Sequence, residues 1–307
     1  MDGRCTHRST LERDAAVNRR QFLARSAGAL VATTPFVIGY TLWVEPHWLE
    51  FVHRDLPIEN LPAHLNGKTL AQLSDIHVGP QVSDAYLAES LQRLRALSPD
   101  IVVYTGDFLS YRPSRGDAQF QQLRDILTVA PRGTIATIGI LGNHDYGVNW
   151  SQPEVAARIA QVLEQQDIQL LRNEVASLPG LDVIGVDDLW AHRADAGAAI
   201  AKRTQSAVIA LCHNPDGLDS LDWTGYRGWV LAGHTHGGQC KPPFLPPPLL
   251  PVRNSRYTAG EIAVNEGRTL YISRGVGHLL KARFNVRPEI TLFTLRRLEQ
   301  NSLAAAG

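Results

Sequence analysis

Aspartate, asparagine and histidine side chains follow five predicted strands of this chain, and these residue types bind metal ions and transfer protons. The clusters are Asp75-Ile76-His77, Gly106-Asp107, Gly142-Asn143-His144-Asp145, His213 and Gly233-His234-Thr235-His236. Each cluster alone has a simpler explanation: a helix cap, a glycine-rich turn or a buried histidine. Five such clusters at five strand ends, taken together, instead indicate one functional site.

The combined donor set indicates which ions it would bind. Asp75, Asp107, Asn143 and the five histidines offer two carboxylates, one amide oxygen and up to five imidazoles. This mixture suits divalent Mn, Fe or Zn better than Ca or Mg, which prefer shells of oxygen alone. One metal ion needs about four ligands. Seven candidate ligands therefore predict two divalent metal ions that share a carboxylate, with the identity of the ions left open.

The elements that position these clusters alternate between strands and helices. Apolar runs predict strands over residues 69–73, 101–104, 134–141, 169–171, 181–186, 207–211, 229–232, 270–273 and 289–295. Amphipathic spacing predicts helices over residues 84–97, 119–129 and 153–166. Such alternation indicates a layered α/β fold, in which binding residues gather at the carboxyl ends of strands.

The five clusters, in this order and context, resemble the motif set of the calcineurin-like metallophosphoesterases, over roughly residues 69–295. The flanks Gly237-Gly238-Gln239 and Arg287-Pro288-Glu289-Ile290 resemble a bacterial membrane-associated phosphodiesterase branch, which includes enzymes similar to UDP-diacylglucosamine pyrophosphatase. The resemblance implies a four-layer αββα sandwich of two mixed β-sheets flanked by helices.

The resemblance also implies a role for each residue. Asp75, His77 and His236 would hold the first metal, and Asn143, His213 and His234 the second, with Asp107 bridging both. His144 would be the catalytic residue that faces the phosphate of the substrate. Two such cations lower the pKa of a shared water and stabilise charge on a phosphoryl group. The implied reaction is attack by a metal-bridging hydroxide.

We therefore expect a metal-dependent hydrolase of a phosphodiester or pyrophosphate, with a phosphorylated small molecule or a lipid-linked envelope substrate. The same chemistry on a soluble nucleotide or phosphoprotein is an alternative, as is a non-catalytic scaffold on the same fold. The formal net charge is zero, so a nucleic-acid partner is not expected. Arg274 follows a predicted strand and could bind phosphate bidentately, although an exposed loop arginine is an equal alternative.

The N-terminus predicts export and attachment to a membrane. Asn18-Arg19-Arg20-Gln21-Phe22-Leu23 resembles a twin-arginine signal, which export machinery reads, and residues 26–44 carry no charge. We expect an uncleaved anchor with the catalytic domain on the extracytoplasmic, periplasmic side; release after signal cleavage is the alternative. The predicted divisions are a leader over residues 1–45, a linker over 46–67, a phosphoesterase domain over 68–298 and a tail over 299–307. Whether Cys212 and Cys240 form a disulfide stays open.

Overall fold

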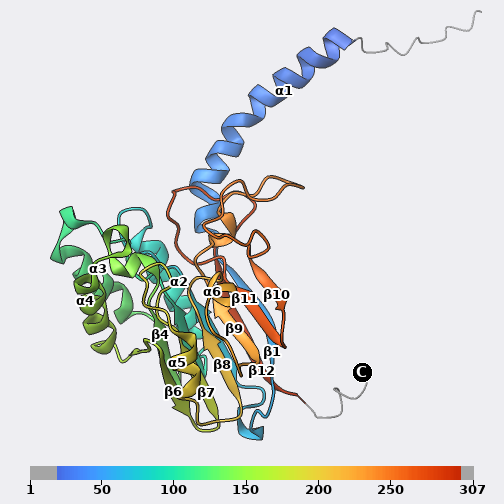
Figure 1. Ribbon diagram of the computed structural model, residues 1–307. Helices are drawn as coiled ribbons and strands as arrows, with labels where there is room; N and C mark the ends of the chain where they lie inside the picture. Colours follow the sequence, from blue (N-terminus) through green and yellow to red (C-terminus); the bar gives the residue numbers. More distant parts are fainter. Residues whose placement is uncertain (1–18, 299–307) are drawn as a thin grey trace, which may run out of the picture. The chain divides into compact units, whose positions relative to one another are not determined.

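The computed structural model describes residues 19–298, and its chain divides into two compact units, residues 1–40 and 41–307 (Figure 1). In the first unit, helix α1 spans Arg19–Gly39 and contains Pro35. Among the helices of residues 19–298, none is long and apolar enough to cross a membrane. Asn18 of the predicted export signal and the predicted tail lie outside the described residues. The leader and its anchor therefore stay predictions.

Two six-stranded mixed sheets form the second unit. The first sheet has the strand order β1-β12-β2-β3-β4-β5, with bounds Glu50–Ile58, Glu289–Arg297, Thr69–Leu73, Ile101–Thr105, Ala136–Ile140 and Gln169–Leu170. The second has the order β10-β11-β9-β8-β7-β6, with bounds Gly260–Val264, Arg268–Ile272, Gly228–Ala232, Val208–Leu211, Leu181–Gly185 and Glu174–Leu178. Strands β2, β3 and β4 are parallel to one another, as are β7, β8, β9 and β11.

Helices cover the outer faces of the two sheets (Figure 1). The α-helices of the second unit are α2 (Asp84–Ala96), α3 (Asp117–Thr128), α4 (Pro153–Glu164), α5 (Ala196–Ala201) and α6 (Gly217–Ser220). Short helical turns span Tyr40–Val44, Glu45–His47, Ala63–Leu65, Pro113–Arg115, Asn143–Tyr146, Val148–Trp150 and His236–Gly238. Layers of helix, sheet, sheet and helix result, as the sequence predicted.

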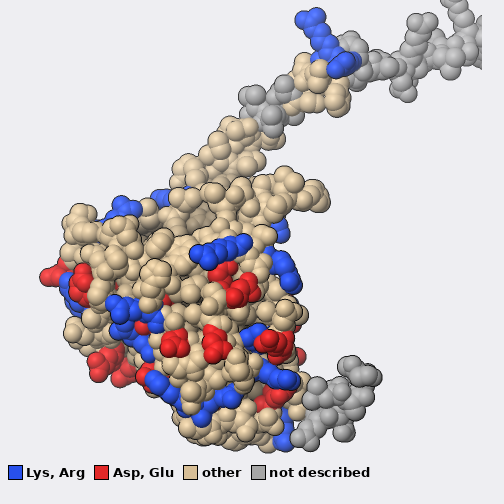
Figure 2. All heavy atoms as spheres, viewed as in Figure 1, with Lys and Arg blue, Asp and Glu red and all other residues tan. Residues whose placement is uncertain are grey.

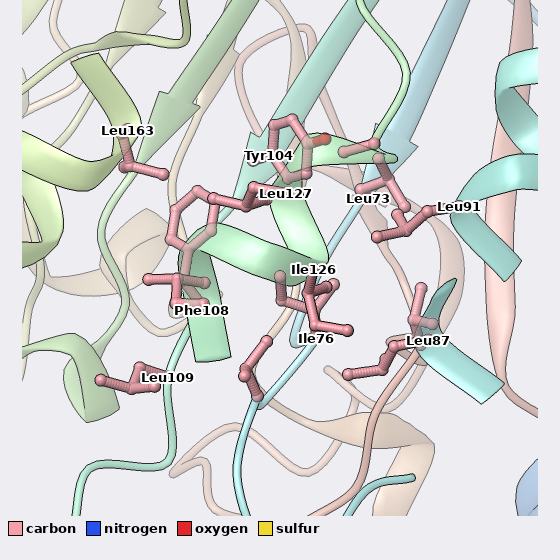
Figure 3. Packing of buried hydrophobic residues seen from close by; sticks show 14 of the residues in the cluster. Leu73, Ile76, Leu87, Leu91, Tyr104, Phe108, Leu109, Ile126, Leu127 and Leu163 are labelled. Atoms are coloured by element: carbon pink, nitrogen blue, oxygen red, sulfur yellow. The ribbon is translucent and has the colours of Figure 1, made fainter. Parts of the chain in front are cut away.

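Three apolar cores lie between these layers because strand side chains alternate between the two faces of a sheet. Leu73 and Tyr104 belong to the outer cluster that also holds Leu87 and Leu91 of α2, and Figure 3 shows Leu73 beside Leu91. Their strand neighbours, such as Leu70 and Val103, face the second sheet. A third core lies between the outer face of the second sheet and α5. The strands that carry the polar clusters are thus buried on both faces.

The structure differs from the predicted domain boundaries at the start of the second unit. Residues 50–58, which the sequence assigned to a linker, form edge strand β1, parallel to β12. Glu45, assigned to the leader, is fully buried and accepts hydrogen bonds from the backbone N–H groups of Asn285 and Val286. A buried carboxylate needs such donors, and they lie about 240 residues away in sequence. Cys212 and Cys240 are both free thiols.

Candidate metal centre

Loops after β2, β3, β4, β8 and β9 bring all seven predicted metal ligands to one place. All seven are buried, with exposed fractions between 0% and 4%. Five of them have a left-handed backbone, with φ between +47° and +71°: Asp75, His77, Asp107, His234 and His236. Residues other than glycine rarely adopt this conformation, and they persist in it where the surrounding structure enforces it, often at functional sites.

A first group of donor atoms comes from Asp75, His77 and His236. Nε2 of His77 lies 3.1 Å from Nε2 of His236, and Oδ1 of Asp75 lies 3.3 Å from the latter. The hydroxyl of Ser110 contacts the other ring nitrogen of His77, at 3.0 Å, and so fixes the orientation of that ring. One carboxylate oxygen and two imidazole nitrogens thus face one point.

A second group comes from Asp107, His213 and His234, with Asn143 beside it. Oδ2 of Asp107 lies 3.2 Å from Nε2 of His213, and Oδ1 of Asn143 lies 2.9 Å from Nδ1 of His234. The same Asp107 oxygen lies 3.5 Å from Nε2 of His77 in the first group. Asp107 therefore stands between the two groups, where a shared carboxylate was predicted.

The orientation of the imidazoles tests whether metal ions fit. Nδ1 of His213 lies 2.7 Å from the carbonyl oxygen of Thr105, and Nε2 of His234 lies 2.8 Å from that of Pro251. A carbonyl oxygen only accepts, so Nδ1 of His213 carries a hydrogen atom. Nε2 of His234 also lies 3.1 Å from the side-chain amide nitrogen of Asn214, which donates. In the neutral form of His213, Nε2 then directs its lone pair at Oδ2 of Asp107 and makes no hydrogen bond. A cation between these two atoms removes that repulsion, so the donor set fits divalent metals.

The electrostatics of the pocket favour the same conclusion. Burial lowers the pKa of His77 and of His234 to about 3 and also lowers that of His236, so these imidazoles are in the neutral form that binds metal. Burial opposes the charged form of His213 as well, but the neighbouring carboxylates, Asp107 first, raise its pKa to about 10. Without metal, His213 is therefore protonated, and its positive charge pairs with the carboxylate of Asp107.

His144 lies beside these groups and is half-buried. Its backbone N–H donates to Oδ1 of Asp107 at 2.9 Å. Its ring meets the ring of His77 edge to face, with centroids 5.1 Å apart. None of the metal-binding groups formed by described residues includes its nitrogens. The structure therefore puts a partly exposed imidazole next to the buried donor atoms, where it can reach a ligand of the metals.

Asp145 is a functional position that the sequence analysis did not single out. Its buried carboxylate accepts four backbone hydrogen bonds: from Asp107 and Gly142 on Oδ2, and from Phe108 and Leu109 on Oδ1. It thereby joins the loop after β3 to the loop after β4. The only signal in the sequence was its place next to His144 in a metal-binding motif.

Gly233 lets the histidine turn approach the first group closely. A Cβ at this position would lie 1.9 Å from the hydroxyl of Ser74 and 2.3 Å from Oδ2 of Asp75. The backbone N–H of His234 donates to both carboxylate oxygens of Asp75 at 3.1 Å. A glycine is therefore required at position 233, because the backbone that leads to His234 packs against the carboxylate of Asp75.

Arg274, for which phosphate binding and a loop position were equal alternatives, pairs with two acids in the structure. Its guanidinium contacts the carboxylates of Glu289 and Glu50, the latter at 2.9 Å. These two acids balance its charge and engage its Nε and Nη2 groups. Phosphate binding by Arg274 stays a prediction. Glu50 and Glu289 lie in the paired strands β1 and β12, so Arg274 fastens the loop after β11 to the edge of the first sheet.

Comparisons with known proteins agree with this geometry. Residues 68–238 match the calcineurin-like phosphoesterase family. The chain is 30% identical to phosphodiesterase YaeI of Escherichia coli, with 91% of this chain and 99% of that protein covered. It is 29% identical to the uncharacterized metallophosphoesterase YkuE of Bacillus subtilis, covering 91% and 98%. It is 27% identical to UDP-2,3-diacylglucosamine pyrophosphatase LpxG of Chlamydia muridarum, covering 86% and 96%.

Proposed function

Because the chain belongs to the calcineurin-like phosphoesterase family, and is thus a hydrolase, we propose that it cleaves a phosphodiester or a pyrophosphate with two bound divalent metals. The observation that carries the proposal is Asp107, whose Oδ2 lies within 3.5 Å of an imidazole from each donor group. Mn, Fe or Zn suit the mixed nitrogen and oxygen donors. Relatives whose names specify a phosphodiesterase and a pyrophosphatase support both bond types.

Asp75, His77 and His236 would hold one metal, and Asn143, His213 and His234 the other, with Asp107 shared. Bound at these positions, the metals would acidify a water molecule and offset the charge that develops on the phosphoryl oxygens. The protein's own part is to keep the imidazoles of His77, His234 and His236 neutral by burial. It also orients the rings of His77, His213 and His234 through contacts with Ser110, Thr105 and Pro251.

We assign His144 to the transfer of a proton to the leaving oxygen. Asp107 holds its backbone, and its ring lies beside His77 without being a ligand. A positioned imidazole contributes about 10²–10⁴-fold to rate through general acid catalysis. The residue is also less buried than the seven ligands, as a group that meets substrate must be.

The proposal is tested by turnover after reconstitution with Mn, Zn or Fe on bis-nitrophenyl phosphate, nitrophenyl phosphate and a UDP-linked lipid. We expect hydrolysis of the diester or the pyrophosphate above that of the monoester. His144→Ala should keep both metals and lose about a hundredfold or more in kcat on the same substrate. Preference for the monoester, or an unmetallated and inert protein, would contradict the proposal, and the second result would favour a scaffold.

We also propose that residues 1–45 export the chain and that the catalytic unit works outside the cytoplasm on a lipid-linked substrate. The support is the arginine pair at Arg19 and Arg20 and the similarity to LpxG. Replacing both arginines by lysine should leave the protein on the cytoplasmic side, where added protease cannot reach it in spheroplasts. Equal protease access for both forms would count against export by this signal.

A further inference from the structure

Exposed apolar side chains gather beside the candidate metal centre. Seven large ones form what we call the apolar rim: Trp43, Val44, Trp48, Phe244, Leu245, Leu249 and Leu280. Their exposed fractions run from 50% for Trp48 to 105% for Phe244. Among the described residues of the second unit, only three other large apolar side chains are exposed, Leu97, Val148 and Leu298, and they lie in separate segments. A concentration of this kind marks a surface that binds something.

Hydrogen bonds join the three segments that carry the rim. Residues 41–48 meet residues 278–287 where the N–H of Arg283 donates to the carbonyl of Thr41 at 3.0 Å. Residues 239–251 join the same segment where the N–H of Lys241 donates to the carbonyl of Phe284 at 2.8 Å. The side chain of Gln239 also donates to the carbonyl of Leu280 at 2.8 Å.

The rim is held against the site by its longest loop. The carbonyl of Pro251 lies 2.8 Å from Nε2 of His234, a predicted metal ligand. A Cβ on Gly238 would lie 2.3 Å from Cβ of Pro247, so the loop packs directly on the histidine turn. Prolines occupy six of the ten positions from 242 to 251, which limits the conformations that this loop can adopt. This restricted loop keeps the side chain of Phe244 exposed to solvent instead of burying it against the protein.

The exposed charges within the three segments of the rim are of one sign. They are Lys241 and Lys281. Glu45 and Arg283 are buried, and Glu50, which follows the first segment, pairs with Arg274 and lies 4.0 Å from Arg287. In Figure 2 the loop that projects at the upper right is tan, and acidic side chains on that face lie below it. Exposed aromatic and aliphatic groups whose own segments carry only exposed cations match the boundary of an anionic bilayer.

We propose that the apolar rim docks the catalytic unit on an anionic lipid surface, with the metal centre held next to the lipid headgroups. Five of the seven side chains of the rim lie outside the predicted leader, residues 1–45. The docking itself needs only the rim, whereas its use in catalysis rests on the proposed function, in which the scissile bond belongs to a lipid-linked molecule. A phosphate bond near the headgroups would then reach the two metals without leaving the bilayer.

Hydrogen exchange of the full chain tests the docking, with vesicles of equimolar phosphatidylcholine and phosphatidylglycerol. We expect the amides of residues 241–258 to exchange about tenfold more slowly on these vesicles than in solution. A variant with Phe244→Ser, Leu245→Ser and Leu249→Ser should lose this protection. The matched control is Leu97→Ser, which removes a leucine that is 53% exposed at the end of α2 and should keep the protection.

Three results would contradict the proposed docking, its occupant or its preference for anionic lipid. Unchanged exchange in residues 241–258 while the protein is bound to vesicles would remove the proposal. Protection that appears without vesicles and grows with protein concentration would assign the rim to a second copy of the chain. Equal protection on pure phosphatidylcholine would remove the preference for anionic lipid. Asp107→Asn should keep the protection while losing turnover of a soluble diester, so the docking and the catalytic proposal fail separately.

Discussion

Asp107→Asn is expected to lower turnover of a phosphodiester by about a thousandfold or more and to reduce metal binding from two ions to at most one. Oδ2 of Asp107 is the atom that both donor groups share, at 3.5 Å from His77 and 3.2 Å from His213. Asparagine keeps the shape of the side chain but removes the negative charge. Its amide can still accept from the backbone of His144 through one oxygen, so the loop should keep its conformation.

Elemental analysis and titration calorimetry with Mn would measure the loss of metal. The kcat on bis-nitrophenyl phosphate would measure the loss of turnover. Asp117→Asn is the matched control, because this carboxylate is 88% exposed and pairs only with Arg158 on the surface. It should retain both metals and full activity. Two bound metals and normal turnover in Asp107→Asn would show that the shared carboxylate does not join the two groups, and the proposed site would have to be abandoned.

The strands that carry the site could be predicted because they are buried on both faces. Strand β2 spans Thr69–Leu73, as its apolar run indicated, and β3, β8 and β9 lie within a residue or two of their predicted bounds. A strand covered on both sides reads as a continuous apolar run. The polar residue at which such a run ends is then visible in the sequence, and this is why the site residues could be found.

The three strands that the sequence analysis missed are all edge strands: β1, β6 and β10. Edge strands are often polar and partly exposed, so they lack an apolar run. In β1 the residues His53, Arg54 and Asp55 resembled a linker, whereas its pairing with β12 joins segments that are more than 230 residues apart. Such pairing depends on the tertiary fold and leaves no local signal.

The contacts within the site that the sequence did not show have the same origin. Arg274 was a reasonable phosphate ligand from its place after a strand, and its partner Glu50 lies 224 residues away in sequence. Asp145 was quoted within a motif but given no role, because its four hydrogen bonds are to backbone groups, which any residues can supply. The types of the donor residues could thus be predicted, whereas their partners could be seen only in the structure.

Asp145→Asn is the second large effect that we expect, and it acts on stability. An amide nitrogen in place of one carboxylate oxygen would face two backbone N–H donors, so two hydrogen bonds would be lost in a fully buried place. Each buried donor left without a partner costs about 1–3 kcal/mol. We therefore expect the free energy of unfolding to fall by about 4 kcal/mol, a large part of the stability of a typical domain.

Urea unfolding of the metal-free protein, followed by tryptophan fluorescence, would measure this change. The control is Asp125→Asn, at an exposed carboxylate that accepts a hydrogen bond from Gln121. The comparison also decides the charge of Asp145. Burial, followed by the nearby charge of Asp107, raises the pKa of Asp145 well above its usual value, although the backbone N–H groups oppose this shift. A protonated oxygen would find only donors around it, so we expect a carboxylate. If the carboxyl were protonated, asparagine would mimic it, and the two variants would unfold at nearly the same urea concentration.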